Sequence, residues 1–196
     1  GDVHVNNTFK KSIEERQGKI WHLHDHIQQR DAQVGKANKV YEREVMWSDL
    51  GVDKKGVTTV VAMETDIIKD YNPMMFKQYQ DGDVDQHSVG MYYVKVELAV
   101  NDSESEEEFK VWNEHINQIG NKELAEEKGF FWAVKEAKLI EISAVLEGSN
   151  SLTPTIEAKQ DIEPSEDTQK DEPSLDTQTE KKVDKESTVY INPYLF

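Results

Sequence analysis

The stretch from Gly82 to Ala99, GDVDQHSVGMYYVKVELA, constrains the fold more than any other part of the sequence. Its first residues are typical of a turn, and from Val89 onward side chains of two kinds alternate with a period of two. Successive side chains of an extended chain point to opposite faces, so one face of this segment is aliphatic and the other is mixed. The sequence therefore predicts a strand that follows directly on a polar, turn-forming lead-in.

Ser88 lies at the start of this predicted strand and is a candidate nucleophile. Its neighbour His87 is a poor general base for it, because adjacent side chains of a strand diverge. Gly90, two residues further on, leaves its side of the strand bare, so another backbone or a substrate could come close. A serine in such a strand is most often structural, and its interpretation as a nucleophile depends on the rest of the chain.

Several other segments have the period-two pattern of strands, and a probable hairpin turn around Asp53 joins two of them into an antiparallel meander. In the last segment, Leu139, Glu141, Ser143 and Val145 are expected to share one face. The predicted strands cover residues 19–27, 40–50, 57–64, 130–137 and 138–146.

Helical spacing of apolar residues predicts helices over 9–15, 73–81 and 109–119. In the second, Asn72 is the expected cap and Pro73 the first residue. Ser105 and Glu108 predict a capping box for the third. Residues 1–20 are otherwise expected to form a loop.

Composition limits the classes of partner. Of the 196 residues, 36% are hydrophobic and 32% are charged, which predicts one domain plus a solvated segment. The net charge of −16 opposes binding to nucleic acid or anionic membranes and favours protein partners. The chain has no cysteine, which excludes disulfides, a thiolate nucleophile and a cysteine zinc site. No apolar run approaches the roughly 20 residues that a membrane-spanning helix needs.

The composition changes after residue 150, so we predict a domain over 1–150 and an acidic tail over 151–196. Residues 151–187 lack aromatic side chains and contain the near repeat EPSEDTQ and EPSLDTQ, which predicts disorder. The apolar end, TVYINPYLF over 188–196, is a candidate docking motif or an ordinary terminus. Because the chain starts at Gly1 without a methionine, we expect a processed or truncated product that lacks an N-terminal strand.

The segment HLHDH carries three alternating histidines, His22, His24 and His26. In an extended segment they share one face, where three imidazoles could bind zinc as in a metal-dependent hydrolase. Compared with the HxHxDH signature of metallo-hydrolases, this segment lacks the residue between the second histidine and the aspartate. Alternatively, the histidines are structural, or one of them takes the proton of Ser88, which is nearly inert until an imidazole does so.

Three separated stretches carry a family resemblance: LHDH at 23–26 followed by Val34-Gly35, QHSVG at 86–90, and LIEISAV at 139–145. They are similar, in order, to the histidine pattern Leu-x-x-His…Ile-Gly, the nucleophile strand Ser-Ile-Gly and the strand Leu-x-Glu-Val-Ser-x-Val of the prohead maturation proteases of tailed phages. This family of serine proteases has a fold that looks like the herpesvirus assemblins. The family's next turn, Pro-Ala-Asn, is replaced here by EGSN over 147–150.

The resemblance implies a serine endopeptidase with Ser88 as nucleophile, His26 as base and Glu141 as acidic partner. If the sequence is aligned instead on the family's His-Asp pair, the resemblance implies His24 as the base. The implied fold is α+β, mainly an antiparallel β-barrel of the assemblin type with a few surface helices and the disordered acidic C-terminal tail.

The resemblance also implies partners and a location. The substrates are phage scaffold and major capsid proteins inside the procapsid, in the host bacterial cytoplasm, with self-cleavage and dimerisation. No cofactor, metal, nucleic acid or membrane is expected. The alternatives are a non-catalytic structural protein that binds the capsid scaffold and the metal-dependent hydrolase described above.

Overall fold

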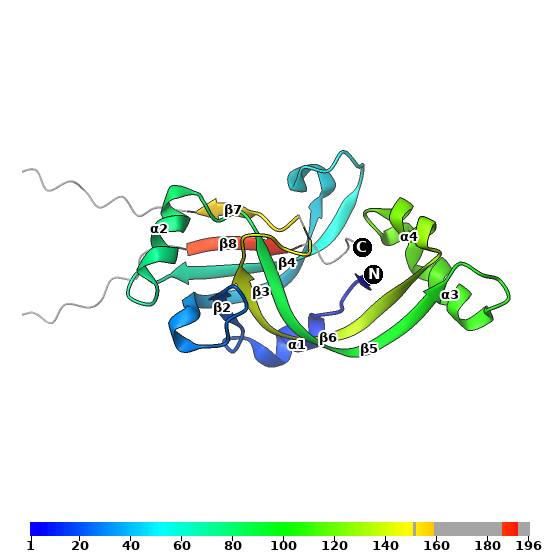
Figure 1. The fold of residues 1–196 in the computed structure, drawn as a ribbon, viewed down its shortest axis with the longest axis horizontal. Helices are drawn as coiled ribbons and strands as arrows, with labels where there is room; N and C mark the ends of the chain where they lie inside the picture. The colour runs from blue at the N-terminus through cyan, green and yellow to red at the C-terminus, as the bar shows by residue number, and fades with distance from the viewer. Residues whose placement is uncertain (151, 159–185, 192–196) are drawn as a thin grey trace, which may run out of the picture.

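One mixed β-sheet organises the described part of the chain, residues 1–150, 152–158 and 186–191 of this computed structural model (Figure 1). Along the sheet the order is β1-β6-β2-β3-β4-β8-β7, and β5 pairs with β6 outside this path. The strands are β1 Asp2–His4, β2 Trp21–His24, β3 Gln33–Met46, β4 Val57–Ile67, β5 His87–Val100, β6 Phe130–Ala144, β7 Thr155–Ala158 and β8 Glu186–Ile191.

The α+β class is confirmed, since four α-helices accompany the sheet in the described residues. The antiparallel meander is also confirmed, because β2 pairs with β3 and β3 with β4 in antiparallel register. Among these residues β1 and β7 end the path without pairing to each other, so the sheet does not close into a barrel. The helices are α1 Lys10–Arg16, α2 Pro73–Asp81, α3 Glu106–His115 and α4 Lys122–Lys128.

Helix α2 follows its local sequence signals closely. The side chain of Asn72 accepts a hydrogen bond of 3.1 Å from the backbone N–H of Met75, and Pro73 is the first helical residue. Gly82 ends the helix with φ of 81°, which a glycine adopts without strain. Helix α3 does begin after Ser105, but that side chain makes no capping hydrogen bond, so the predicted capping box is wrong.

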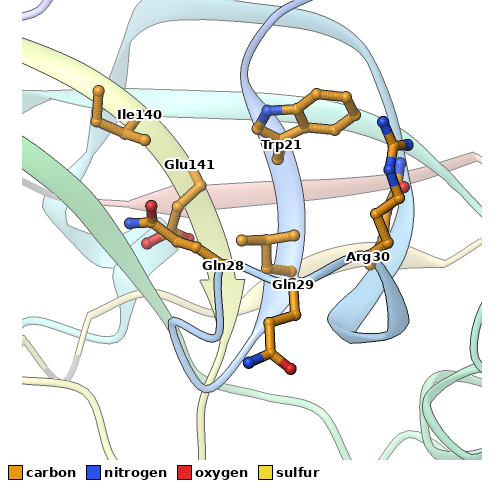
Figure 2. A pocket seen from close by; sticks show the side chains of 8 residues that line it. Trp21, Gln28, Gln29, Arg30, Ile140 and Glu141 are labelled. Carbon is orange, nitrogen blue, oxygen red and sulfur yellow. The ribbon is translucent and has the colours of Figure 1, made fainter.

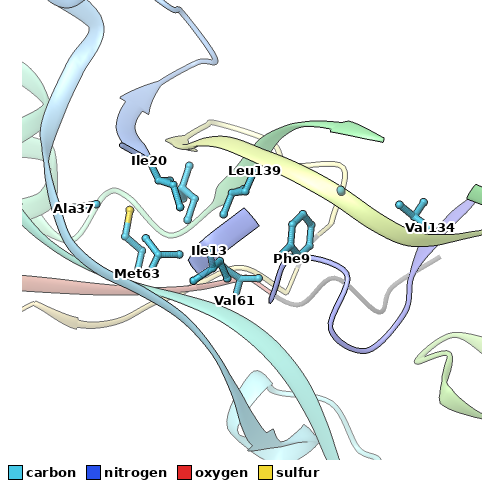
Figure 3. Close-up of a cluster of buried hydrophobic side chains, with 11 residues drawn as sticks. Phe9, Ile13, Ile20, Ala37, Val61, Met63, Val134 and Leu139 are labelled. Atoms are coloured by element: carbon cyan, nitrogen blue, oxygen red, sulfur yellow. The ribbon is translucent and has the colours of Figure 1, made fainter. Parts of the chain in front are cut away.

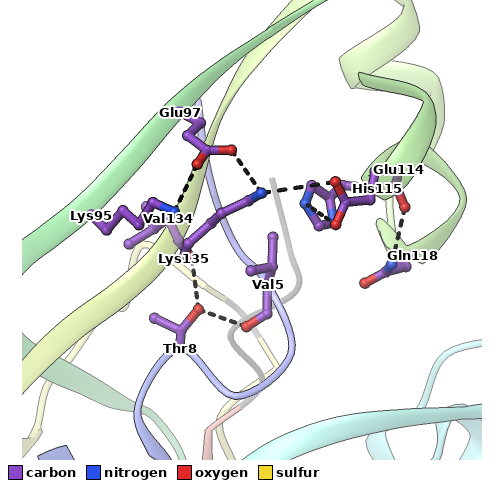
Figure 4. A network of polar contacts seen from close by, with 9 residues as sticks. All are labelled: Val5, Thr8, Lys95, Glu97, Glu114, His115, Gln118, Val134 and Lys135. Carbon is purple, nitrogen blue, oxygen red and sulfur yellow. Dashed lines mark hydrogen bonds and ion pairs between the residues drawn. The ribbon is translucent and has the colours of Figure 1, made fainter. Parts of the chain in front are cut away.

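Strands β5 and β6 form a long antiparallel ribbon that curves away from the rest of the sheet toward α3 and α4 (Figure 1). The two strands predicted over 130–146 are one continuous strand of 15 residues, because no turn interrupts β6. Trp112, Ile116 and Phe131 belong to the buried cluster between these helices and the ribbon. A polar network extends this attachment, because Lys135 contacts Glu97 at 2.6 Å and Glu114 of α3 at 3.8 Å (Figure 4).

The main core lies between α1 and the sheet. Phe9, just before the helix, and Ile13 within it pack among side chains of β3, β4 and β6 (Figure 3). Helix α1 is fixed to β6 by Ser12, whose Oγ accepts a hydrogen bond of 2.8 Å from the backbone N–H of Leu139. This core supports the strands of the candidate site from one face. The cluster contains Phe9, Ile13, Ile20, Ala37, Val40, Val61, Met63, Val134, Ala137, Leu139 and Ile142.

A β-bulge in β6 decides which side chains reach the site. Gly90 of β5 pairs with Glu141, but the next residue, Met91, pairs with Leu139, so β6 has one extra residue, Ile140. A bulge of this kind re-aims the side chains on either side of it. Leu139 therefore belongs to the core while Glu141 points to the other face, and the prediction that they share a face is wrong.

Several other boundaries differ from the sequence prediction. Residues 2–4 form β1 rather than a loop, and a 3₁₀ turn over Trp47–Leu50 replaces the end of the predicted 40–50 strand. Residues 155–158 and 186–191 form β7 and β8, where β8 pairs with β4, so these parts of the predicted tail are in the sheet. The disorder predicted for 159–185 and the docking end at 192–196 lie outside the described residues. The helices of the described part are all too short and polar to cross a membrane.

Candidate active site

His26 and Glu141 form a close polar pair at the end of β2 and β6. The Nδ1 atom of His26 lies 2.6 Å from Oε1 of Glu141. The carboxylate is buried, with 1% of its side chain exposed, whereas the imidazole is 42% exposed. Nδ1 is thus occupied by the carboxylate, and Nε2 makes no hydrogen bond within the described residues. An imidazole held in this way presents its second nitrogen to whatever occupies the adjoining surface.

A left-handed turn brings His26 to this carboxylate. Asp25 has φ of 52° and His26 has φ of 57°. The extended conformation of β2, with its alternation of side chains, therefore ends just before these two residues. Non-glycine residues adopt the left-handed conformation only where the surrounding contacts hold it. Here the backbone N–H of Asp25 donates to the carbonyl of Ala144 at 2.9 Å, which ties the turn to the end of β6.

Ser143 completes the support of the pair. Its hydroxyl donates to Oε2 of Glu141 at 2.6 Å and accepts a hydrogen bond of 3.2 Å from the backbone N–H of His26. Both carboxylate oxygens of Glu141 are therefore used, one by the imidazole and one by the serine. Ser143 is fully buried, so its hydroxyl is a structural element of the site and has no access to a substrate.

Gly90 provides the space that Glu141 occupies. A Cβ atom built on Gly90 would lie 1.9 Å from Oε1 of Glu141, much closer than any real contact. The sequence predicted that a backbone or a substrate approaches Gly90, and the structure places the carboxylate side chain there instead. Because Oε1 is the oxygen that contacts His26, the glycine is required for the geometry of the pair.

Ser88 lies on the same face of the sheet as Glu141 and Ser143. It pairs directly with Ser143, two residues from the pairing of Gly90 with Glu141, and alternate residues of a strand share a face. Its side chain is half-buried, and its hydroxyl makes no hydrogen bond to His24, His26 or any other described residue. The structure therefore joins two members of the predicted triad by a hydrogen bond and places the third on the adjacent strand.

The two alternative bases differ clearly in position. His24 contacts its own neighbour Asp25 at 3.2 Å and belongs to the face of β2 opposite Leu23. Of these two histidines, His26 is the one that contacts Glu141. The geometry thus favours the alignment that makes His26 the base.

The metal alternative required His22, His24 and His26 on one face, and this prediction is wrong. The left-handed turn separates His26 from the other two, and His22 is fully buried against Thr65 and Tyr79. In the described part of the chain, no group of three or more histidine, aspartate or glutamate side chains has a spacing that could hold a metal ion.

His22 and His87 instead join a buried polar chain on the core side of the sheet. The hydroxyl of Tyr79 lies 2.9 Å from Nε2 of His22 and 2.9 Å from Nε2 of His87. Burial lowers the pKa of His87 to about 4, and burial, followed by repulsion from His87, lowers the pKa of His22 well below its usual value. The prediction that His87 is a poor base for Ser88 agrees with this placement, because the His87 ring lies on the face of the sheet opposite Ser88.

The surface is hollowed on both sides of Glu141. One pocket is lined by Trp21, Leu23, Gln28, Gln29, Arg30, Gln33, Ile140 and Glu141. Figure 2 shows Ile140 and Glu141 on one side of it and Arg30 on the other. A second, more open hollow contains His26 and Glu141 together with residues 89–93 of β5. The pair therefore lies between two depressions that run across β2, β6 and β5.

No known protein family, curated protein or solved structure matches the chain. The function must therefore be argued from the site itself. Sequence reasoning named Ser88, His26 and Glu141, but it missed the supporting role of Ser143. The spacing of Glu141 and Ser143 on one strand was the signal that could have indicated it.

Proposed function

We propose that this protein is a serine endopeptidase of the prohead maturation type, with Ser88 as nucleophile, His26 as base and Glu141 as the group that orients the imidazole. The observation that supports it is the buried carboxylate of Glu141 on Nδ1 of His26, with Nε2 left toward the surface. In a serine protease the acid holds the imidazole in the tautomer that can accept the serine proton. Two of the three residues named from distant motifs are thus hydrogen-bonded to each other, and Ser88 lies on the strand next to Glu141, on the same face of the sheet.

The mechanism follows from these positions. Ser88 attacks a peptide carbonyl while Nε2 of His26 takes its proton, and the same nitrogen then protonates the leaving amine. Glu141 stabilises the imidazolium that forms between these steps, and its burial strengthens this interaction. Hydrolysis of the acyl-enzyme repeats the sequence with water as the nucleophile.

The shape of the surface supports a polypeptide substrate. The Trp21 pocket has a volume of about 270 Å³, below the range of about 300–1,000 Å³ that is usual for small-molecule sites. Such a pocket fits one amino-acid side chain, and the hollow along β5 continues on the other side of the pair. The proposed substrates are scaffold and capsid polypeptides in the procapsid, and the proposed fold type is assemblin-like.

Cleavage of a co-expressed scaffold and capsid protein tests the proposal. The wild type is expected to cleave, and both Ser88→Ala and His26→Ala are expected to lose cleavage by about 10³-fold or more. Ser103→Ala, an exposed serine outside the site, is the matched control and should cleave normally. Undiminished cleavage by Ser88→Ala would reject the nucleophile, and loss of cleavage on adding a chelator would reject the metal-free mechanism.

A non-catalytic protein that binds the capsid scaffold is the second candidate. It is favoured by one observation, the lack of a hydrogen bond from Ser88 to either histidine within the described residues. Catalytic hydrogen bonds are often long before substrate binds, so this observation is compatible with both functions. Scaffold binding that persists in Ser88→Ala, with no cleavage by any form, would favour the structural role.

A further inference from the structure

The hydrogen bonds of the buried histidines define one direction of donation. The carbonyl oxygen of Thr153 can only accept, so Nδ1 of His87, 3.0 Å away, carries the proton of that ring. The ring is neutral, because its pKa is lowered to about 4, and its Nε2 therefore accepts from the hydroxyl of Tyr79. That hydroxyl has a single proton, which is used on His87.

The same reasoning continues to the second histidine. The oxygen of Tyr79 must accept from Nε2 of His22, so that nitrogen carries the proton of the His22 ring. Nδ1 of His22 then accepts from the hydroxyl of Thr65, 3.2 Å away. Hydrogen bonds are thus donated in one order, from Thr65 through His22, Tyr79 and His87 to the carbonyl of Thr153. Each ring nitrogen has one partner, and the Tyr79 oxygen has two.

This chain joins the two strands that carry the candidate base and nucleophile. His22 lies on β2, two residues before its end and four before His26, while His87 is the residue before Ser88 on β5. Strands β2 and β5 do not pair with each other, since β6 lies between them. Tyr79 of α2 bridges them across β6, and its side chain is buried. The backbone N–H of His87 also donates to Oγ1 of Thr153 at 3.0 Å, which fixes the start of β5 a second time.

We propose that Tyr79 is a positioning residue, whose hydroxyl holds His22 and His87 in opposite tautomers and thereby sets the position of β5 relative to β2. The effect of Tyr79 on catalysis by Ser88 and His26 rests on the proposed function. The tautomers and the strand positions do not depend on that function. Removal of the hydroxyl leaves a buried N–H of His22 without an acceptor and a buried nitrogen of His87 without a donor. The two strand ends then lose their common anchor while the pairing of each with β6 remains.

Nitrogen NMR of the full chain at pH 7 tests the tautomers directly. The expected result is a protonated Nδ1 in His87 and a protonated Nε2 in His22. The opposite tautomer in either ring, or a charged ring, would overturn the proposal. Thr65→Val removes the donor to Nδ1 of His22 but leaves the Tyr79 hydroxyl in place, so the His22 tautomer should persist, whereas Tyr79→Phe should release it.

Hydrogen exchange tests the positioning role without any assay of activity. Tyr79→Phe should raise exchange at the backbone N–H groups of residues 22 and 87 by about tenfold, with little change over 96–100 at the far end of β5. Tyr71→Phe removes an exposed hydroxyl just before the same helix and is the matched control. Equal changes over both parts of β5, or none, would overturn the proposal.

Reaction with a fluorophosphonate connects the network to the site. The oxygen of Ser88 forms a bond to phosphorus, fluoride leaves, and the imidazole takes the hydroxyl proton. Tyr79→Phe should lower the labelling rate by about tenfold, and an unchanged rate in a wild type that does react would overturn the link to Ser88. If the wild type does not react, the proposed function fails, while the NMR and exchange results still decide the position of β5.

Discussion

Substitution of Gly90 by alanine is the sharpest perturbation that the site offers. The added Cβ would lie 1.9 Å from Oε1, 2.7 Å from Cδ and 3.0 Å from Cγ of Glu141. The carboxylate cannot move into solvent without unfolding its surroundings, because only 1% of it is exposed. Either the contact with His26 breaks or β5 separates locally from β6.

Both outcomes have an expected magnitude. Forcing a methyl group into a packed position costs about 1–3 kcal/mol, and loss of a hydrogen bond to a charged group costs about 1.5–3 kcal/mol. We therefore expect Gly90→Ala to lower the free energy of unfolding by about 1–3 kcal/mol and to lower the rate of Ser88 labelling by about 10²-fold or more.

A matched experiment shortens the side chain that carries the carboxylate of Glu141. Glu141→Asp removes one methylene group, so in the Gly90→Ala background it makes room for the new methyl. Urea unfolding and fluorophosphonate labelling of both single variants and the double variant give the coupling between the two positions. The double variant should lose less than the sum of the single losses. Wild-type stability and labelling in Gly90→Ala would refute the placement of Glu141 against β5.

Three further predictions concern other parts of the structure. Ser143→Ala should lower labelling of Ser88 by about 10–100-fold, because an oxygen of buried Glu141 loses its donor; wild-type rates in this variant would contradict the role. The neutral ring of His87 should make the unfolding free energy fall as the pH drops from about 6.5 to about 4, since the unfolded chain takes up the proton first. The loss is about 3 kcal/mol, and urea unfolding of the wild type and His87→Gln at pH 7 and 4.5 should show a smaller loss in the variant; equal losses would contradict it. Asn72→Ala should cost about 1 kcal/mol of stability by removing the α2 cap, whereas Asn72→Asp should cost little; thermal melts compare the two, and equal melting temperatures of the wild type and Asn72→Ala would contradict the cap.

Elements with local signals could be predicted from the sequence. Helix α2 was predicted at its exact bounds because its cap, its first-turn proline and its terminal glycine are contiguous. The predicted Ser105 capping box failed even though the motif is present, because the side chain does not adopt the capping geometry. Short strands such as β1 were missed, because three residues have too little periodicity and β1 is stabilised by β6, more than 120 residues away.

The candidate site depends on features with no local signal. The left-handed turn at Asp25 and His26 contains no glycine, so no local signal indicates it. The sequence prediction of an extended segment therefore placed the three histidines on one face. The bulge at Ile140 is likewise a property of the pairing between β5 and β6. The meeting of His26 with Glu141 was expected only from the resemblance to prohead proteases, because 115 residues separate them.

The central claim is that Ser88 is the nucleophile of a Ser-His-Glu site. Peptide mapping by mass spectrometry after fluorophosphonate treatment tests it most directly, because it identifies the modified residue. We predict modification at Ser88, lost when His26 is changed to alanine and retained in Ser103→Ala. Modification at another serine, or labelling of Ser88 that does not depend on His26, would contradict it.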